Sequence, residues 1–322
     1  MFLTYIKGVV RVMILFLFGS TGEIVTEKSG HLNMGTPGIM CMGATGAVVG
    51  AKIYLDSCGG VYNSNGFLGI AIPMLFCLLF AGITGLLYCF LVDTLQCNQN
   101  VTGLTITTLG AGVFPFVSNV TKNEGFSILS AKYYVRLFPQ QFAEANWFTE
   151  LFFSYSFLVY LAIIIAVVAL IVLKKTKVGL SLRAVGENPG TADASGINVK
   201  GYKYISTLVG SCISGLGGIY YLMVMNNGAL EFSIEAFGWL SVALVIFSIW
   251  NPGFAIAGSF VFAAFYQLPV FITTSSGTAV GKIIELIPYF VTIVVLIIIS
   301  LFNKRETQPP AGLGVNYFRE DR

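Results

Sequence analysis

A polar segment, Lys174–Lys203, lies between two long apolar runs and carries the residues whose types and spacing indicate a function. Asn188 can accept a backbone hydrogen bond as a helix N-cap, Pro189 suits the first turn of a helix, and Gly196 can end it in the left-handed conformation. The sequence therefore predicts a short helix, Pro189 to Ser195, at the membrane surface. A helix fixed at both ends is suited to contacting a partner protein.

The same segment is strongly basic. The segment contains only two acidic residues, Glu187 and Asp193. Its six basic residues are Lys174, Lys175, Lys177, Arg183, Lys200 and Lys203. Because short basic loops stay in the cytoplasm, we expect this loop to be cytoplasmic. Alternation along the chain then places 93–100 and the tail from Asn303 inside, and 56–65, 119–147 and 226–235 outside.

Groups that could perform catalysis are largely missing. The single histidine, His31, excludes a two-histidine metal site and a histidine-paired nucleophile network. The six cysteines contain no C-x-x-C pair, and we interpret them as packing residues. The stretch Gly277–Lys282, GTAVGK, resembles a phosphate loop, but it has one residue too few between its glycines and Ile283 replaces the required Ser or Thr. We therefore expect no catalytic residue, no metal site and no cofactor, and the chain cannot hydrolyse ATP by itself.

Composition identifies the elements that must position the loop. Charged residues make up 10% of the chain, hydrophobic ones 56%, and the mean hydropathy is +0.81; a soluble domain carries about 25% charge. Apolar runs lie at 33–55, 66–92, 101–118, 148–173, 204–225, 236–250, 253–268 and 282–302, after an ambiguous first segment within 2–25. We expect an all-α integral membrane protein, a polytopic helical bundle of about 8–10 transmembrane segments.

Two of these runs are short for a full crossing. Ala236–Trp250 and Gly253–Leu268 are joined at Asn251-Pro252, which predicts a broken or re-entrant pair of helices. Such backbone is tolerated at membrane depth only where protein covers it or where it lines a wet cavity. The pair is therefore a candidate wall of a pathway.

Glycines recur at close spacing inside the apolar runs. They are Gly43, Gly46, Gly50, Gly210, Gly215, Gly217 and Gly218. Small residues on one helix face let backbones approach closely in lipid. We favour tight helix packing at these positions over a moving hinge.

Intramembrane charge is sparse. The charged residues in these regions, such as Glu23, Asp93 and Glu285, lie near the ends of predicted segments, so no proton relay is visible at mid-membrane. This argues against a secondary carrier, and the missing catalytic cluster argues against a membrane enzyme.

Three segments resemble bacterial ABC importer permeases of the branched-chain amino acid and ribose class, most closely the nucleoside branch. They are Glu27–Gly35 (EKSGHLNMG) followed by Gly38-Ile39-Met40, the loop Gly179–Val199 (GLSLRAVGENPGTADASGINV), and Phe237–Gly253. The chain departs from the family pattern at Thr36-Pro37 and at Phe247-Ser248-Ile249. These departures bear on the substrate preference more than on membership of the family.

The resemblance implies a non-catalytic permease subunit in the bacterial plasma membrane. Residues 1–302 would form one transmembrane permease domain, and 303–322 a cytoplasmic tail. Partners would be a cytoplasmic ABC ATPase that binds the ATP, a homologous sister permease or a second copy, an external substrate-binding lipoprotein and the lipid bilayer, with no nucleic acid. The loop would hold the coupling helix, with Arg183, Asn188, Pro189, Thr191, Ala192, Asp193, Ser195 and Gly196 coupling to the ATPase. The small Ala192 would enter a groove of the ATPase.

The substrate path is less well defined by the sequence. Its candidate residues are Asn33, Phe114, Phe116, Asn251, Thr273 and Thr274. Aromatic faces would suit a nucleobase, although aromatic residues near membrane interfaces are commonly anchors. A nucleoside or related sugar-containing solute is the expected substrate; ribose, another simple sugar or a branched-chain amino acid are the alternatives.

Overall fold

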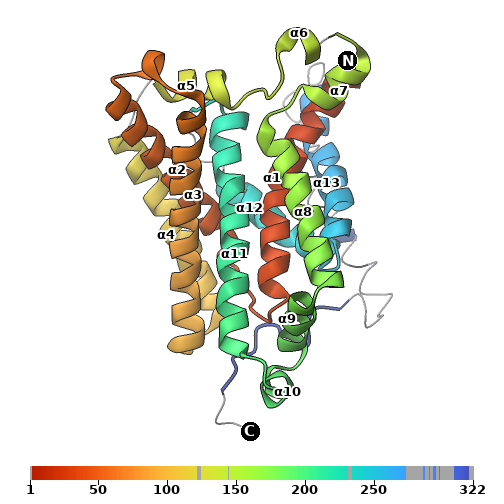
Figure 1. Ribbon diagram of the computed structural model, residues 1–322. Helices are drawn as coiled ribbons and strands as arrows, with labels where there is room; N and C mark the ends of the chain where they lie inside the picture. Colours follow the sequence, from red (N-terminus) through yellow and green to blue (C-terminus); the bar gives the residue numbers. More distant parts are fainter. Residues whose placement is uncertain are drawn as a thin grey trace.

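The computed structural model describes residues 2–121, 125–143, 145–230, 234–272, 308–318 and a few single residues between 286 and 297. Its long helices stand side by side (Figure 1). They are α1 (Phe2–Glu27), α2 (Thr36–Cys58), α3 (Gly66–Cys89), α4 (Gln99–Val120), α8 (Phe157–Lys175), α11 (Val199–Tyr220) and α13 (Pro252–Ile272). Within the described residues, all seven are long and apolar enough to cross a membrane. The predicted all-α polytopic bundle is confirmed.

Short helices cover the two ends of the bundle. At one end lie the N-terminal end of α1, α5 (Gly125–Tyr133), α6 (Gln140–Ala143) and α7 (Trp147–Phe153), near the turn η1 (Val61–Asn63). At the other end lie α9 (Lys177–Glu187) and α10 (Pro189–Ala194). The described parts of the loops that alternation assigned to the outside and to the inside therefore lie at opposite ends. If the basic loop is cytoplasmic, the N-terminal end of α1 is external. We call the end with α9 and α10 the inner end.

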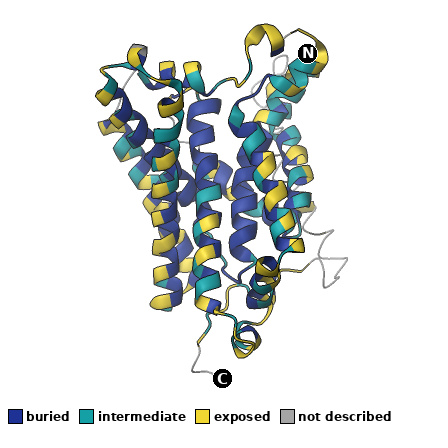
Figure 2. Ribbon diagram, in the orientation of Figure 1, coloured by how far each residue is buried: buried dark blue, intermediate teal, exposed yellow. Residues whose placement is uncertain are grey.

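The centre of the bundle is formed by α1, α2 and α11. These helices are dark blue over most of their length, whereas α3, α4 and α8 show yellow outward faces (Figure 2). The outward faces of α3 and α8 carry apolar side chains, for example Leu79 on α3 and Ile164 on α8. Because lipid tails solvate such side chains, this pattern fits a bundle surrounded by a bilayer.

The central helices pack through glycines, as predicted. A Cβ atom on Gly43 of α2 would lie 2.6 Å from Cα of Gly215 on α11, and one on Gly218 would overlap the carbonyl oxygen of Met40. Side chains at these positions would push the two backbones apart. Tight packing is therefore the role that the structure gives to these positions.

The predicted crossing at 148–173 is wrong in its first part. The apolar run is divided into α7 and α8, and Ser156 caps α8 by accepting a hydrogen bond from Leu158 N at 3.4 Å. Glu150 on α7 instead pairs with Lys7 of α1 at 2.8 Å. Of α7 and α8, only α8 is long enough to be a candidate membrane span. Hydropathy does not reveal this break, because serine is uncharged and the apolar run around it looks continuous.

The last described helices, α12 (Ile234–Phe247) and α13, meet at a tight turn. With 14 residues, α12 is about 21 Å long, too short to cross alone. The turn holds Ile249 at φ 55° and Trp250 at φ 50°, values that are strained for bulky side chains. α13 begins at Pro252, extends beyond the predicted segment and is long enough to span. The predicted run 282–302 falls mostly outside the described residues.

Candidate functional site: the inner end of the bundle

The predicted helix of the basic loop is present as α10. Asn188 Oδ1 accepts a hydrogen bond from Thr191 N at 3.0 Å, and Pro189 occupies the first helical turn. At its other end Gly196 has φ +83°, the left-handed conformation that the sequence predicted. Ile197 N then donates to Ala192 O at 3.1 Å, which ties the chain back onto the helix. α10 is therefore fixed at both ends by local hydrogen bonds.

A second helix in the loop, α9, was missed from the sequence. Thr176 caps it by accepting a hydrogen bond from Gly179 N at 3.1 Å, and its buried face includes Leu182 and Val185. The signal was present in the sequence as a threonine cap followed by apolar residues at helical spacing. The loop is thus a pair of short helices, not one helix in an irregular loop.

The face that α10 presents differs from the predicted one. Ala192 is only 4% exposed and packs with Val185 of α9 and Val199 of α11. It cannot enter a groove of another protein while this packing holds. The outward face instead comprises Thr191, Ala194, Ser195 and Gly196, with Arg183 exposed on α9.

The chain segment 308–318 packs against this loop. Gly312 N donates to Gly186 O at 2.9 Å, and the Tyr317 hydroxyl donates to Asp193 Oδ2 at 2.8 Å. One carboxylate oxygen of Asp193, expected to contact a partner, therefore has a partner within its own chain. No pattern in the sequence indicates that the tail returns to the loop.

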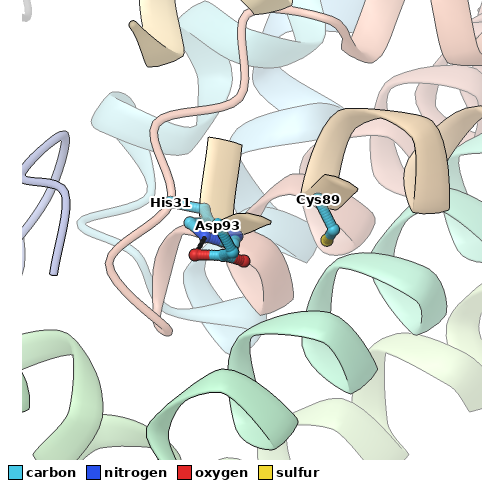
Figure 3. Close-up of side chains that lie close together, drawn as sticks. All are labelled: His31, Cys89 and Asp93. Carbon is cyan, nitrogen blue, oxygen red and sulfur yellow. Dashed lines mark hydrogen bonds and ion pairs between the residues drawn. The ribbon is translucent and has the colours of Figure 1, made fainter. Parts of the chain in front are cut away.

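A buried ionic network lies next to the loop, in a place where the sequence showed only scattered charges. The ring of His31 hydrogen-bonds through Nε2 to Asp93 Oδ1 at 3.0 Å and through Nδ1 to Thr207 Oγ1 at 2.8 Å. Lys203 Nζ lies 3.9 Å from the same Asp93 oxygen, and its side chain is 2% exposed. Figure 3 shows the His31 and Asp93 side chains turned toward each other. From the sequence, Lys203 counts among the basic residues of the loop, but its side chain is buried beside Asp93.

Cys89 lies beside this network. Its sulfur and the ligand atoms of His31 and Asp93 fall within 4.8 Å of one another, close enough to consider a metal ion (Figure 3). A bound cation would, however, sit beside the Lys203 ammonium group, and both ring nitrogens of His31 are engaged in hydrogen bonds. We therefore interpret the cluster as an ion pair that joins the 28–35 loop, the helical turn η2 (Phe90–Thr94) after α3, and α11.

This network predicts a pH dependence. Burial lowers the pKa of His31 below its ordinary value of 6.5, although Asp93 acts in the opposite direction. Because the unfolded chain then binds a proton more readily than the folded one, stability is full above about pH 6.5 and is lost as the pH falls through the lowered pKa. In detergent, lowering the pH from about 7.5 to about 5.5 should reduce the melting temperature more for the wild type than for His31→Gln. Equal reductions would contradict this role of His31.

Two further buried carboxylates lie at the inner end of α1. Glu23 accepts hydrogen bonds from Thr36 and, at 3.3 Å, from Asn33 Nδ2. Glu27, one turn later, accepts from the indole of Trp250 in the strained turn before α13. These bonds join the end of α1 to the start of α2 and to the α12–α13 turn.

The residues predicted to line the substrate path lie in different parts of the structure. Asn33 is buried in the Glu23 cluster, and Asn251 caps α13 by accepting from Gly253 N at 3.0 Å. Phe114 is 2% exposed and belongs to the core, whereas Phe116 is 70% exposed on the outer half of α4. Thr273 and Thr274 lie outside the described residues. The structure therefore does not bring the four described residues together.

Comparisons with known proteins agree with this architecture. A family profile described as branched-chain amino acid transport system / permease component matches residues 4–300. The chain is 30% identical over 306 residues to the nucleoside ABC transporter permease protein NupC of Lactococcus lactis subsp. cremoris, covering 94% of this chain and 93% of that relative. It is 27% identical to the guanosine ABC transporter permease protein NupQ of Bacillus subtilis, covering 94% and 92%. It is 26% identical to the putative glucose ABC transporter permease protein TsgC13 of Haloferax volcanii, covering 80% and 74%. Since the profile covers nearly the whole chain and the fold is a bundle of membrane-spanning helices, the chain belongs to the permease component family of the branched-chain amino acid transport system type.

Proposed function

We propose that this chain is the membrane permease subunit of an ATP-binding cassette importer that carries nucleosides. The observation that carries the proposal is the similarity to two nucleoside permeases over more than nine-tenths of the chain. The relative named for glucose matches less of the chain, so a simple sugar is the second candidate. The permease itself performs no catalysis, and a separate ATPase, a second permease and an external binding protein complete the importer.

The helix α10 is the proposed docking element for the ATPase. It is held by caps at both ends and projects from the inner end of the bundle (Figure 1). A rigid element of this kind can transmit a displacement of the ATPase to the membrane helices. With Ala192 buried, the docking surface consists of Thr191, Ala194 and Ser195.

The outward face of α4 is the proposed path-facing surface. Phe116 and Asn119 are exposed there, and Thr105 and Thr108 continue the same face toward the inner end. Threonine hydroxyls and an amide offer weak hydrogen-bond partners, and an aromatic ring offers a stacking surface for a base. In a pair of permeases, this face would line the path between the subunits.

Transport assays test the proposed function. In membrane vesicles that contain the assembled importer, uptake of labelled guanosine should require ATP and persist with an ionophore. Unlabelled nucleosides with other bases should compete, because stacking accepts any base. Competition by glucose or leucine with none by nucleosides would refute the nucleoside assignment. Uptake that is abolished by the ionophore but not by ATP depletion would refute the importer class.

The docking surface has its own test. Ala194→Trp should reduce co-purification of the ATPase, since a large ring replaces a methyl group on the exposed face of α10. Ser127→Trp is the matched control, because Ser127 is exposed at the opposite end of the bundle. Retention of the ATPase by Ala194→Trp at the control level would mean that α10 is not the docking helix.

A further inference from the structure

The segment from Ala311 to Tyr317 crosses the inner end of the bundle and contacts three separate parts of the chain. Its first contacts are with the junction of α9 and α10: Ala311 N donates to Glu187 Oε2 at 3.3 Å, and Gly312 N donates to Gly186 O at 2.9 Å. A Cβ on Gly312 would lie 2.7 Å from that same Gly186 oxygen. The two backbones are therefore in close contact at the start of α10.

The next contact is with the loop between α1 and α2. Gly314 N donates to Gly30 O at 3.1 Å, directly before His31 of the buried ionic network. Leu32 N, directly after His31, donates to Gln99 Oε1 at 2.8 Å. The backbone on both sides of His31 is thus held by the tail or by a residue that the tail contacts.

The third contact is with the turn between α3 and α4. Asn316 Nδ2 lies 3.2 Å from Gln96 O and 3.1 Å from Cys97 O, and Asn316 Oδ1 accepts from Gln99 Nε2 at 2.9 Å. The side-chain amide of Asn316 therefore forms hydrogen bonds with three groups at this turn. Tyr317 then returns to α10, where its hydroxyl donates to Asp193 and its ring packs with the cluster around Ala192.

These contacts form a closed circuit. It runs from α10 through Tyr317 and Asn316 to the α3–α4 turn, through Gln99 to the loop around His31, and through Gly314 and Gly312 back to α10. The loop around His31 continues to Asn33 and Thr36, which donate hydrogen bonds to Glu23 of α1. A displacement of α10 is therefore connected to the buried inner ends of α1, α2 and α3 by hydrogen bonds as well as by the peptide chain.

We propose that the segment 311–317 is a strap that makes α10, the His31 loop and the α3–α4 turn move as one body, with Asn316 and Tyr317 as its positioning residues. The inference rests on the proposed function of α10 as the helix that docks the ATPase. Without the strap, the contacts that hold α10 among the described residues are its own packing and the chain on either side. Movement of the ATPase would then be absorbed by α10 and would not reach the membrane helices.

The strap is tested by the number of substrate molecules transported per ATP hydrolysed in the assembled importer. Tyr317→Phe removes one hydrogen bond to a carboxylate and keeps the ring. We expect a reduction of the coupling ratio by about threefold to tenfold, with ATPase co-purification and the rate of ATP hydrolysis unchanged. Tyr202→Phe is the matched control, since Tyr202 packs against the same cluster and no hydrogen bond of its hydroxyl is seen among the described residues.

A cross-link provides a rescue experiment. Asn316→Cys removes the three amide contacts and should lower the coupling ratio under reducing conditions. Oxidation should join it to Cys97, whose carbonyl now accepts from Asn316, and should restore coupling in proportion to the cross-linked fraction. Asn316→Cys in a Cys97→Ser background should show no rescue.

Several outcomes would overturn the strap. They are a wild-type coupling ratio in Tyr317→Phe, no cross-link between positions 316 and 97, or a cross-linked protein that stays uncoupled. Failure of the proposed function is distinguishable, because the wild-type chain would then not co-purify with an ATPase at all. If the ATPase is present and Tyr317→Phe is fully coupled, only the strap is refuted.

Discussion

Gly218→Ala is expected to prevent normal assembly of the bundle, with a loss of about 3 kcal/mol or more in stability. The added methyl group would overlap the carbonyl oxygen of Met40 and lie 2.8 Å from Ala44 N, both backbone atoms of α2. Backbone atoms cannot rotate away as a side chain does, so α2 and α11 must separate along their contact. The expected measurement is a large decrease in the monodisperse fraction and in the melting temperature after detergent extraction.

Gly112→Ala is the matched control. It makes the same substitution in another long helix, α4, at a position where a Cβ atom has no neighbour within 4 Å. Because alanine favours the helix over glycine by about 1 kcal/mol, the control should be neutral or slightly stabilised. Equal melting temperatures for the two variants would contradict the packing role of Gly218.

Lys203→Met is expected to cost about 3 kcal/mol, because it leaves the carboxylate of Asp93 buried without its ammonium partner. Asp93 Oδ2 already has no hydrogen-bond partner among the described residues, and only His31 would remain at Oδ1. Methionine keeps the length of the side chain, so the loss reports charge more than packing. Thermal unfolding in detergent should show the decrease.

The double variant Lys203→Met/Asp93→Asn should recover most of this loss, since both charges are then removed together. Lys200→Met is the control on the same helix, where the lysine is exposed, and it should be nearly neutral. A double variant as unstable as the sum of the two single variants would show that Lys203 and Asp93 do not act as a pair.

Local interactions account for what could be predicted at the candidate site. Asn188 and Gly196 set the start and end of α10 through hydrogen bonds between residues three to five positions apart in the sequence, and Pro189 suits its first turn. Such bonds depend only on neighbouring residues, so the residue types suffice to predict them. The direction in which Ala192 faces depends instead on Val185 and Val199, which belong to other helices. The helix could therefore be predicted from the sequence, whereas the buried orientation of Ala192 could not.

Hydropathy and charge, which are sums over a segment, determined by themselves that this protein is a polytopic membrane bundle and which of its loops lie together. Only the tertiary structure decided that His31 meets Asp93 across 62 positions and that Tyr317 meets Asp193 across 124. Each of these polar residues looks like an isolated charge or hydroxyl near the end of an apolar run. Their partners are chosen by the packing of whole helices, which brings together groups that no local pattern connects.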